Sequence, residues 1–134
     1  MGIPVPAINW RVSSVTICRR RRFVADHFHD LPGFQEARHG HNWELEAEVL
    51  DRDASAGHPS ERLAARLEAL LDRWIQDVDY TLLNDQSALE GRNPTAEALA
   101  EWAFGHLEAN GLEPRRVKVR EKANYWAACG RIQA

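Results

Sequence analysis

The pattern of apolar and polar residues predicts three β-strands along the chain and a further one near its end. Residues 11–25 are rich in β-branched side chains and contain neither glycine nor proline, which favours a long strand. From residue 39 to about residue 50, apolar residues or histidines alternate with asparagine and glutamate. Alternate side chains of a strand point to opposite faces, so this segment predicts a strand with one apolar and one acidic face. Residues 116–122 alternate in the same way, and residues 125–132 can form the fourth strand.

Two segments with the spacing of amphipathic helices lie between the second and third predicted strands. Residues 60–77 place four leucines and a tryptophan on one stripe, and Ser60 is a suitable N-cap. A second helix is predicted from Asn93-Pro94-Thr95, where proline is tolerated in the first turn, to the stop signal Asn110-Gly111. Strands separated from a block of helices indicate an α+β fold, which we expect to form one domain over residues 1–134. Two helices cover only one face of a sheet, so we expect a homo-oligomer to cover the other.

Composition and charge exclude several classes of function. The net charge is −3, and the only basic block, at residues 19–22, is typical of a solvated strand edge, so we expect no nucleic-acid partner. No apolar stretch approaches the roughly 20 residues of a membrane span, and the start of the chain lacks a signal-peptide pattern. The two cysteines, Cys18 and Cys129, make no disulfide framework. These features predict a cytoplasmic protein without a membrane partner.

Three histidines form the sharpest candidate site. His39 and His41 are two residues apart on a predicted strand, so their side chains point the same way, about 6–7 Å apart, and can converge on one metal ion. His27 follows the end of the first predicted strand, which can lie beside the second. Three imidazoles with one open position are typical of catalytic zinc, although half-buried histidines without a metal are an alternative. His29 is near enough to be a spare ligand, but an ordinary polar residue is the simpler interpretation.

Four parts of the chain resemble a known family. Residues 23–27 (FVADH) and 33–43 (GFQEARHGHNW) resemble the F-x-A-A-H and H-G-H-N signatures of the 6-pyruvoyl-tetrahydropterin synthase and 6-carboxy-tetrahydropterin synthase family. Asp79 with Leu83-Asn84-Asp85 resembles its L-D-H-x-x-L-N-D segment. Residues 93–97 (NPTAE) resemble its N-P-T-S/A-E helix start, and residues 117–121 (VKVRE) resemble its last V-x-V-x-E strand. These segments occur in the family's order over almost the whole chain.

The resemblance implies a tunnelling fold of the order β2α2β2. In this fold two helices cover one face of a four-stranded antiparallel sheet. Three subunits close a twelve-stranded barrel and two barrels stack, so the implied assembly is a trimer or a hexamer.

The resemblance also implies a set of site residues. The implied ligands of Zn²⁺ are His27, His39 and His41. The family's last-strand glutamate anchors a pterin by accepting hydrogen bonds from its ring, and Glu121 takes that place, with Thr95 and Glu97 as further substrate-binding residues. Independently of the family, an acid that shares a strand face with two valines indicates a buried carboxylate with a partner.

Two departures from the family pattern bear on the reaction. Gln35 stands where members that make pyruvoyl or carboxy products carry a catalytic cysteine, and Glu36 follows it. A subgroup with glutamate in this G-F-x-E setting converts 7,8-dihydroneopterin triphosphate to 6-hydroxymethyl-7,8-dihydropterin, a folate precursor. The resemblance therefore makes Glu36 the candidate general base. The family's catalytic Asp-His pair is Asp79-Tyr80 here, and tyrosine is a poor proton relay at neutral pH because its unperturbed pKa is about 10.

The sequence thus predicts a zinc-dependent pterin lyase of the 6-hydroxymethyl type, with Glu36, Asp79 and Tyr80 as its catalytic residues. The alternative within the enzyme class is 6-carboxy-tetrahydropterin formation in 7-deazaguanine (queuosine) synthesis, which the missing cysteine disfavours. A third interpretation is a homologue that binds zinc and pterin but has lost catalysis, which Tyr80 favours.

Overall fold

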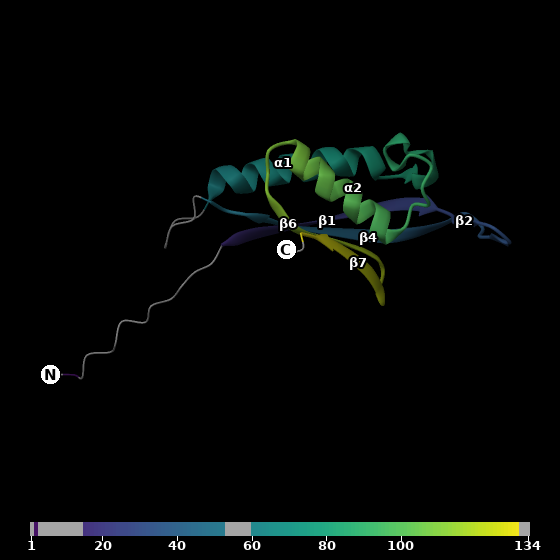
Figure 1. The fold of residues 1–134 in the computed structure, drawn as a ribbon, viewed down its shortest axis with the longest axis horizontal. Helices are drawn as coiled ribbons and strands as arrows, with labels where there is room; N and C mark the ends of the chain where they lie inside the picture. Colours follow the sequence, from purple (N-terminus) through teal and green to yellow (C-terminus); the bar gives the residue numbers. More distant parts are fainter. Residues whose placement is uncertain (1, 3–14, 53–59, 132–134) are drawn as a thin grey trace.

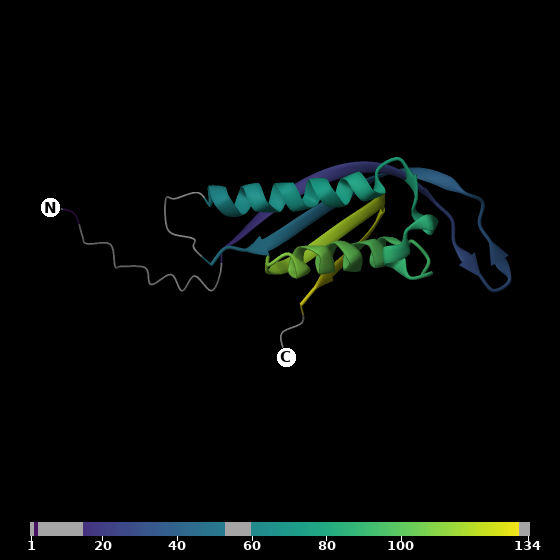
Figure 2. The ribbon, with the colours of Figure 1, turned by 90° about the horizontal axis from the view of Figure 1, so that it is seen from above.

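The computed structural model describes residues 2, 15–52 and 60–131, and its two long helices lie side by side on one face of a sheet (Figure 1). The helices are α1 (Glu61–Val78) and α2 (Ala96–Ala109). The four long strands are β1 (Thr16–His27), β4 (His39–Leu50), β6 (Pro114–Lys122) and β7 (Tyr125–Gly130). The α+β class and the placement of both helices on one face are confirmed (Figure 2).

The sheet has five strands in the order β5-β1-β4-β6-β7, one more than the sequence predicts. The four long strands pair antiparallel, as predicted, and the additional strand, β5 (Thr81–Leu82), is parallel to β1 at the edge of the sheet. Two contacts tie the chain after α1 to β1: the Tyr80 N–H donates to the Val24 carbonyl at 2.6 Å, and the Val24 N–H donates to Asp79 Oδ1 at 2.9 Å. A strand of two residues has no alternation that a sequence pattern could reveal.

The first strand continues to His27, two residues beyond its predicted end, while residues 11–14 of the prediction lie outside the described residues. The reason is pairing with β4, which runs without interruption from Thr16 opposite Leu50 to His27 opposite His39. His27 is therefore a strand residue that faces His39 in register, and not a loop residue after the strand.

The predicted helix starts need one correction each. Ser60 precedes α1, but its side chain does not cap the helix, because its hydroxyl binds the Asp51 carboxylate. The second helix begins at Ala96 and not at residue 93, with Thr95 as the N-cap whose Oγ1 accepts from the Ala98 N–H at 3.1 Å. Its end before Asn110-Gly111 is confirmed.

The segments predicted as loops contain short elements. Residues 26–38 include a hairpin of β2 (Asp30–Leu31) and β3 (Phe34–Gln35), which projects beyond the end of the main sheet (Figure 2). Gly33 makes its turn with φ +77°, a conformation that glycine adopts without steric cost. The connection between the helices contains the 3₁₀ turns η1 (Leu83–Asp85) and η2 (Ser87–Leu89).

The hydrophobic core lies between the helices and one face of the sheet. The alternation predicted for β4 is confirmed, because Trp43, Leu45, Ala47 and Val49 are all completely buried. From the helices the core includes Leu67, Leu71, Trp74, Leu99 and Leu107. The same rows of alternate residues continue into the histidines at the start of β4, so core packing sets the direction of the site residues.

Strand alternation divides the basic block at residues 19–22 between the two faces. Arg19 pairs with Glu68 and Arg21 with Asp72 on α1, whereas Arg20 pairs with glutamates of β4 on the other face. The block is therefore not a single basic patch. Within the described residues, no helix is long and apolar enough to cross a membrane.

Candidate metal centre and substrate cavity

Three histidine side chains meet where β1 ends and β4 begins. His27 is completely buried and pairs in register with His39, and His41 follows two residues later on the same strand. One ring nitrogen of each histidine lies within 4.8 Å of the other two, so the predicted convergence is present. A Cβ on Gly40, between the two β4 histidines, would lie 2.5 Å from Asp26 Oδ1, so any other residue there would have to displace the Asp26 carboxylate.

The hydrogen bonds of two rings fix which nitrogens face the centre. His27 Nδ1 lies 2.8 Å from the Pro94 carbonyl, and His39 Nδ1 lies 2.8 Å from the Ala37 carbonyl. A carbonyl only accepts, so each Nδ1 carries the hydrogen and each neutral ring presents an Nε2 lone pair. These two Nε2 atoms are nevertheless only 3.1 Å apart. A separation of 3.1 Å fits either one hydrogen shared between the two nitrogens or a metal ion bound by both lone pairs. Nδ1–H donation to a carbonyl is the usual support of a metal-binding histidine.

The third histidine is also suited to a metal. His41 Nε2 is buried and has no hydrogen-bond partner in the described part of the chain. Burial lowers the pKa of His41, and burial likewise lowers the pKa of His27 even though the Pro94 carbonyl and Glu121 act in the opposite direction. A lowered histidine pKa means that the ring is neutral at pH 7, which is the form that binds metal. A donor set of three imidazoles that converge in this way fits zinc.

A carboxylate from β6 reaches the same cluster. Glu121 lies in the row of the completely buried Val117 and Val119, and its side chain is only 12% exposed. Its Oε1 lies 3.2 Å from His27 Nε2 and 3.8 Å from His41 Nε2. The predicted buried and partnered acid is thus present, and it faces the histidines.

A cavity of about 270 Å³ opens beside this cluster, and we call it the histidine cavity. The first turn of α2 contributes two of the predicted substrate-binding residues, Thr95 and Glu97. The phenol of Tyr125 donates to Glu97 Oε1, which lowers the pKa of Glu97 and raises that of Tyr125. The full lining is His29, Glu36, His39, His41, Thr95, Ala96, Glu97, Glu121, Lys122 and Tyr125.

Glu36 lies beside the metal centre, in the lining of the histidine cavity. It follows β3 directly, and its side chain is 27% exposed. Its Oε1 lies 3.6 Å from His39 Nδ1, and its Oε2 lies 3.6 Å from His29 Nδ1. The structure therefore brings the predicted general base next to one of the candidate zinc ligands.

The structure does not bring Asp79 and Tyr80 to this cavity. The Asp79 carboxylate accepts the Val24 N–H at the edge of β1, and Tyr80 is 83% exposed with φ +57°. Neither residue lines the histidine cavity. Within one chain, two of the three predicted catalytic residues thus lie apart from the third.

Four cavity residues, among them Ala96 at the start of α2, were not predicted as site residues from the sequence. Lys122 and Tyr125 lie on either side of the turn between β6 and β7, whose position under α2 no local pattern reveals. His29 does carry a signal, because it lies two residues after His27, with the same spacing as His39 and His41.

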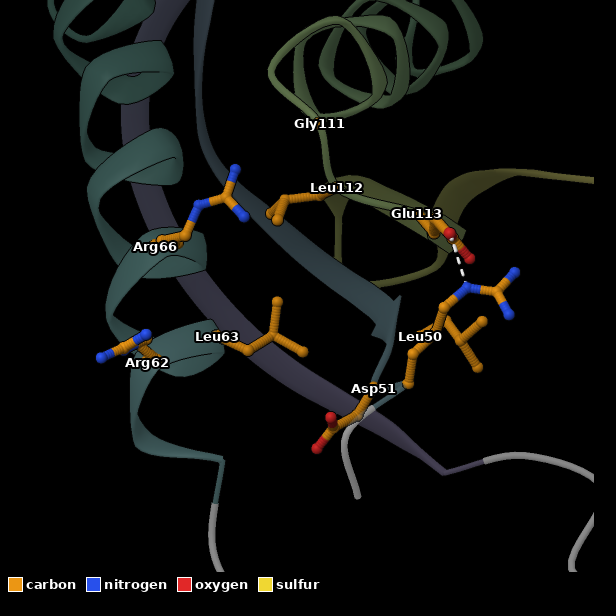
Figure 3. A pocket seen from close by; sticks show the side chains of 9 residues that line it. Leu50, Asp51, Arg62, Leu63, Arg66, Gly111, Leu112 and Glu113 are labelled. Carbon is orange, nitrogen blue, oxygen red and sulfur yellow. Dashed lines mark hydrogen bonds and ion pairs between the residues drawn. The ribbon is translucent and has the colours of Figure 1, made fainter.

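A second cavity, of about 220 Å³, lies at the other end of β4, and we call it the arginine cavity (Figure 3). Leu63 and Leu112 point into it, and Arg66 extends across it toward Gly111. Its lining consists of Leu50, Asp51, Arg52, Arg62, Leu63, Arg66, Gly111, Leu112 and Glu113. None of these side chains was predicted as a site residue, and they include no histidine.

A family model and a relative of known sequence both relate this chain to the tetrahydropterin synthases. The model of the family described as 6-pyruvoyl tetrahydropterin synthase matches residues 16–131. A protein of Archaeoglobus fulgidus, provisionally named 6-carboxy-5,6,7,8-tetrahydropterin synthase, is 31% identical over 101 residues, which cover 74% of this chain and 83% of that protein.

Solved structures show the same fold at low identity. The 6-pyruvoyl tetrahydropterin synthase of Caenorhabditis elegans matches with a TM-score of 0.72 at 20% identity, covering 92% of this chain and 99% of that chain. A 6-pyruvoyltetrahydropterin synthase of Plasmodium vivax, solved with its catalytic glutamate replaced by cysteine, matches with a TM-score of 0.62 at 12% identity and covers 87% of this chain and 97% of that chain. At these identities the two likenesses establish the fold.

Proposed function

The chain belongs to the 6-pyruvoyl tetrahydropterin synthase family, and from this premise we propose that it is a zinc-dependent lyase that shortens the side chain of 7,8-dihydroneopterin triphosphate. The product is 6-hydroxymethyl-7,8-dihydropterin. The observation that carries this choice is the position of Glu36, whose carboxylate lies 3.6 Å from the candidate ligand His39, next to the place where other members carry a cysteine.

His27, His39 and His41 would hold the zinc ion through their Nε2 atoms. Support comes from the two Nδ1–H donations to carbonyls and from the unpartnered Nε2 of His41. When bound there, zinc supplies Lewis acidity, which lowers the pKa of the substrate's side-chain hydroxyls.

Glu36 acts as the general base on a hydroxyl of the side chain. It accepts the proton of the hydroxyl on the second side-chain carbon, the bond between the first and second carbons breaks, and that second carbon leaves as an aldehyde. The electron pair of the broken bond passes into the pterin ring system, and a proton returns to the first carbon. Glu121 holds the ring, with Thr95 and Glu97 beside it. A carboxylate in a half-buried cavity is a suitable base for such a step.

The Plasmodium vivax protein supports a carboxylate base, because that protein has a glutamate described as catalytic. Asp79 and Tyr80 would then assist from a neighbouring subunit, since Asp79 binds Val24 on β1, away from the histidine cavity, and Tyr80 is exposed. The proposal therefore includes a homo-oligomer, a trimer or a hexamer, in which the site is completed across an interface.

Incubation of zinc-loaded protein with 7,8-dihydroneopterin triphosphate tests the proposal. We expect 6-hydroxymethyl-7,8-dihydropterin to form, and we expect Glu36→Ala to abolish its formation without loss of zinc. No turnover, or a Glu36→Ala variant as active as the parent, would refute the catalytic role.

A second candidate is 6-carboxy-tetrahydropterin synthesis, which the name of the Archaeoglobus fulgidus relative favours. Gln35 counts against it, because an amide cannot replace the catalytic cysteine. The same incubation distinguishes the two, since this reaction yields the 6-carboxy product. If neither product forms and Tyr80→His restores turnover, the chain is a binding homologue that has lost its proton relay.

A further inference from the structure

We infer that His29 positions the Glu36 carboxylate in the histidine cavity and offers its other ring nitrogen to a side-chain hydroxyl of the substrate. This inference rests on the proposed function, because it assigns a role within the same site. His29 is not among the three proposed zinc ligands, and the family signatures quoted above place no histidine two residues after the first ligand.

His29 approaches both oxygens of the Glu36 carboxylate. Its backbone N–H donates to Oε1 at 3.3 Å, and its ring Nδ1 lies 3.6 Å from Oε2. The Glu36 N–H in turn donates to the His29 carbonyl at 3.4 Å. The two residues flank the β2–β3 hairpin, one directly before β2 and the other directly after β3. The β2–β3 hairpin therefore brings Glu36 into contact with His29.

The other imidazole near Glu36 is already engaged. His39 Nδ1 lies 3.6 Å from Oε1, but its hydrogen is directed at the Ala37 carbonyl 2.8 Å away. A neutral ring has a single N–H, so His39 cannot also donate to Glu36. His29 Nδ1 is consequently the ring donor that can fix the direction of the carboxylate. A separation of 3.6 Å is longer than a hydrogen bond, and such contacts commonly shorten when substrate fills the site.

The second ring nitrogen of His29, Nε2, is buried and makes no hydrogen bond with the described residues of the protein. With the hydrogen on Nδ1, Nε2 is an acceptor, and a buried acceptor without a donor is unfavourable. His29 lines the histidine cavity, and one of its ring nitrogens lies within 4.8 Å of the ligand atoms of His27 and Glu121. A substrate hydroxyl held beside His29 in the cavity would supply the missing donor.

The tautomer of His29 tests the inference without any turnover. In zinc-loaded, full-length protein with ¹⁵N-labelled histidine, long-range ¹H–¹⁵N correlation spectra report which ring nitrogen carries the hydrogen. We expect the hydrogen on Nδ1 of His29, and a shift toward Nε2 in Glu36→Ala. His106 is the internal control, because its Nε2 lies 2.8 Å from the Leu70 carbonyl and must keep its hydrogen in both proteins.

Two spectra would overturn the inference. One is hydrogen on Nε2 of His29 in the parent protein, either alone or together with Nδ1. The other is a His29 signal that Glu36→Ala leaves unchanged. Because the parent and Glu36→Ala both keep the His29 ring, neither result depends on whether a His29 variant folds.

Two substitutions then test the effect on catalysis. His29→Phe keeps an aromatic ring but removes the Nδ1–H donor. We expect kcat to fall about 100-fold, because the Glu36 carboxylate is then misplaced. His29→Asn keeps an N–H near the position of Nδ1, and we expect it to regain most of kcat. Both variants lack the Nε2 acceptor for the substrate hydroxyl, so we expect KM to rise in both. The two variants should therefore differ in kcat and not in KM. Equal loss of kcat in the two variants at equal zinc content would overturn the positioning role.

The failure of the proposed function would look different. If the parent protein does not turn over 7,8-dihydroneopterin triphosphate, the proposed reaction is wrong, and the spectra alone decide whether His29 holds Glu36. If the parent is active and His29→Phe retains its kcat, the reaction stands and the role of His29 is refuted.

Discussion

The histidine cavity and the arginine cavity lie at opposite ends of β4, and charged side chains line both of them. In the arginine cavity two of the three lining arginines have partners: Arg52 binds Glu113 at 2.7 Å, and Arg66 donates to the Asn110 carbonyl at 2.9 Å. In the histidine cavity the Nε2 atoms of His29 and His41 are buried without hydrogen-bond partners. They are two of the four such side-chain atoms in the described part of the chain, and none of the four belongs to the arginine cavity.

This difference indicates that the histidine cavity is a ligand-binding site, whereas the arginine cavity is a structural feature of the fold. Buried polar groups in folded proteins nearly always have partners, and an unpaired one costs about 1–3 kcal/mol. Two unpaired imidazole nitrogens in one cavity therefore indicate groups that the protein itself does not supply. We propose that zinc binds His41 Nε2 and that a substrate hydroxyl donates a hydrogen bond to His29 Nε2.

Removal of one charged group from each cavity should give the largest contrast. Glu36→Gln should lower kcat by about 10²- to 10⁴-fold, because an amide cannot accept the substrate proton. Arg52→Gln, the matched control, should leave kcat unchanged, because the exposed pair with Glu113 lies at the other end of the sheet. Product formation at saturating substrate measures both, with zinc content determined in parallel. Similar losses in the two variants would contradict the distinction between the cavities.

Zinc should stabilise the fold through the histidine cavity alone. With free zinc at about 1,000 times its dissociation constant, binding to the native state should add about 4 kcal/mol to the free energy of unfolding. His41→Ala should lose this gain, because it removes a ligand whose Nε2 has no hydrogen-bond partner among the described residues. Denaturation curves with and without a chelator measure the effect. A chelator that leaves the parent's melting temperature unchanged would count against zinc binding.

Truncation in the arginine cavity should affect stability but not zinc binding. Leu112 is 4% exposed and its side chain points into the arginine cavity (Figure 3). Leu112→Ala should lower the free energy of unfolding by about 2 kcal/mol, at the low end for a buried leucine because the site already borders a cavity. Urea denaturation of the zinc-loaded protein gives the value. A change in zinc stoichiometry would show that the two ends of β4 are coupled.

A smaller effect is expected at the turn after α2. Gly111 has φ +86°, and a Cβ there would lie 3.3 Å from Arg66 Nη2. Gly111→Ala should lower the free energy of unfolding by about 1–2 kcal/mol, because side chains other than glycine are strained in this conformation. Gly105→Ala within α2 is the matched comparison, since a Cβ there would meet no atom within 4 Å. Equal stability of Gly111→Ala and the parent would mean that the turn relaxes.

Periodicity predicted the long elements of the fold because each of them buries one face. The alternation from His39 to Leu50 marked β4, and the leucine stripe marked α1. The short elements could not be predicted in this way. β5 depends on contacts of Asp79 and Tyr80 with Val24, and Ser60 binds Asp51 instead of capping α1. Both depend on contacts with residues outside the element itself, which its own periodicity cannot reveal.

The candidate site was predicted to a similar extent. The spacing of His39 and His41, together with the family resemblance, located the three histidines that the structure brings together. Spacing could not show that Tyr80 points away from the cavity, since this depends on how the chain leaves α1. It also could not show that Tyr125 lies beside Glu97, because the turn between β6 and β7 sets that distance.

Zinc analysis of the purified chain is the most direct test of the central claim. Elemental analysis combined with X-ray absorption should find one zinc per chain, bound by imidazole nitrogens and no sulfur, and His41→Ala should fold but lose the ion. A parent protein without stoichiometric zinc, or with zinc bound by Cys18 or Cys129, would contradict the assignment of His27, His39 and His41 as the metal centre.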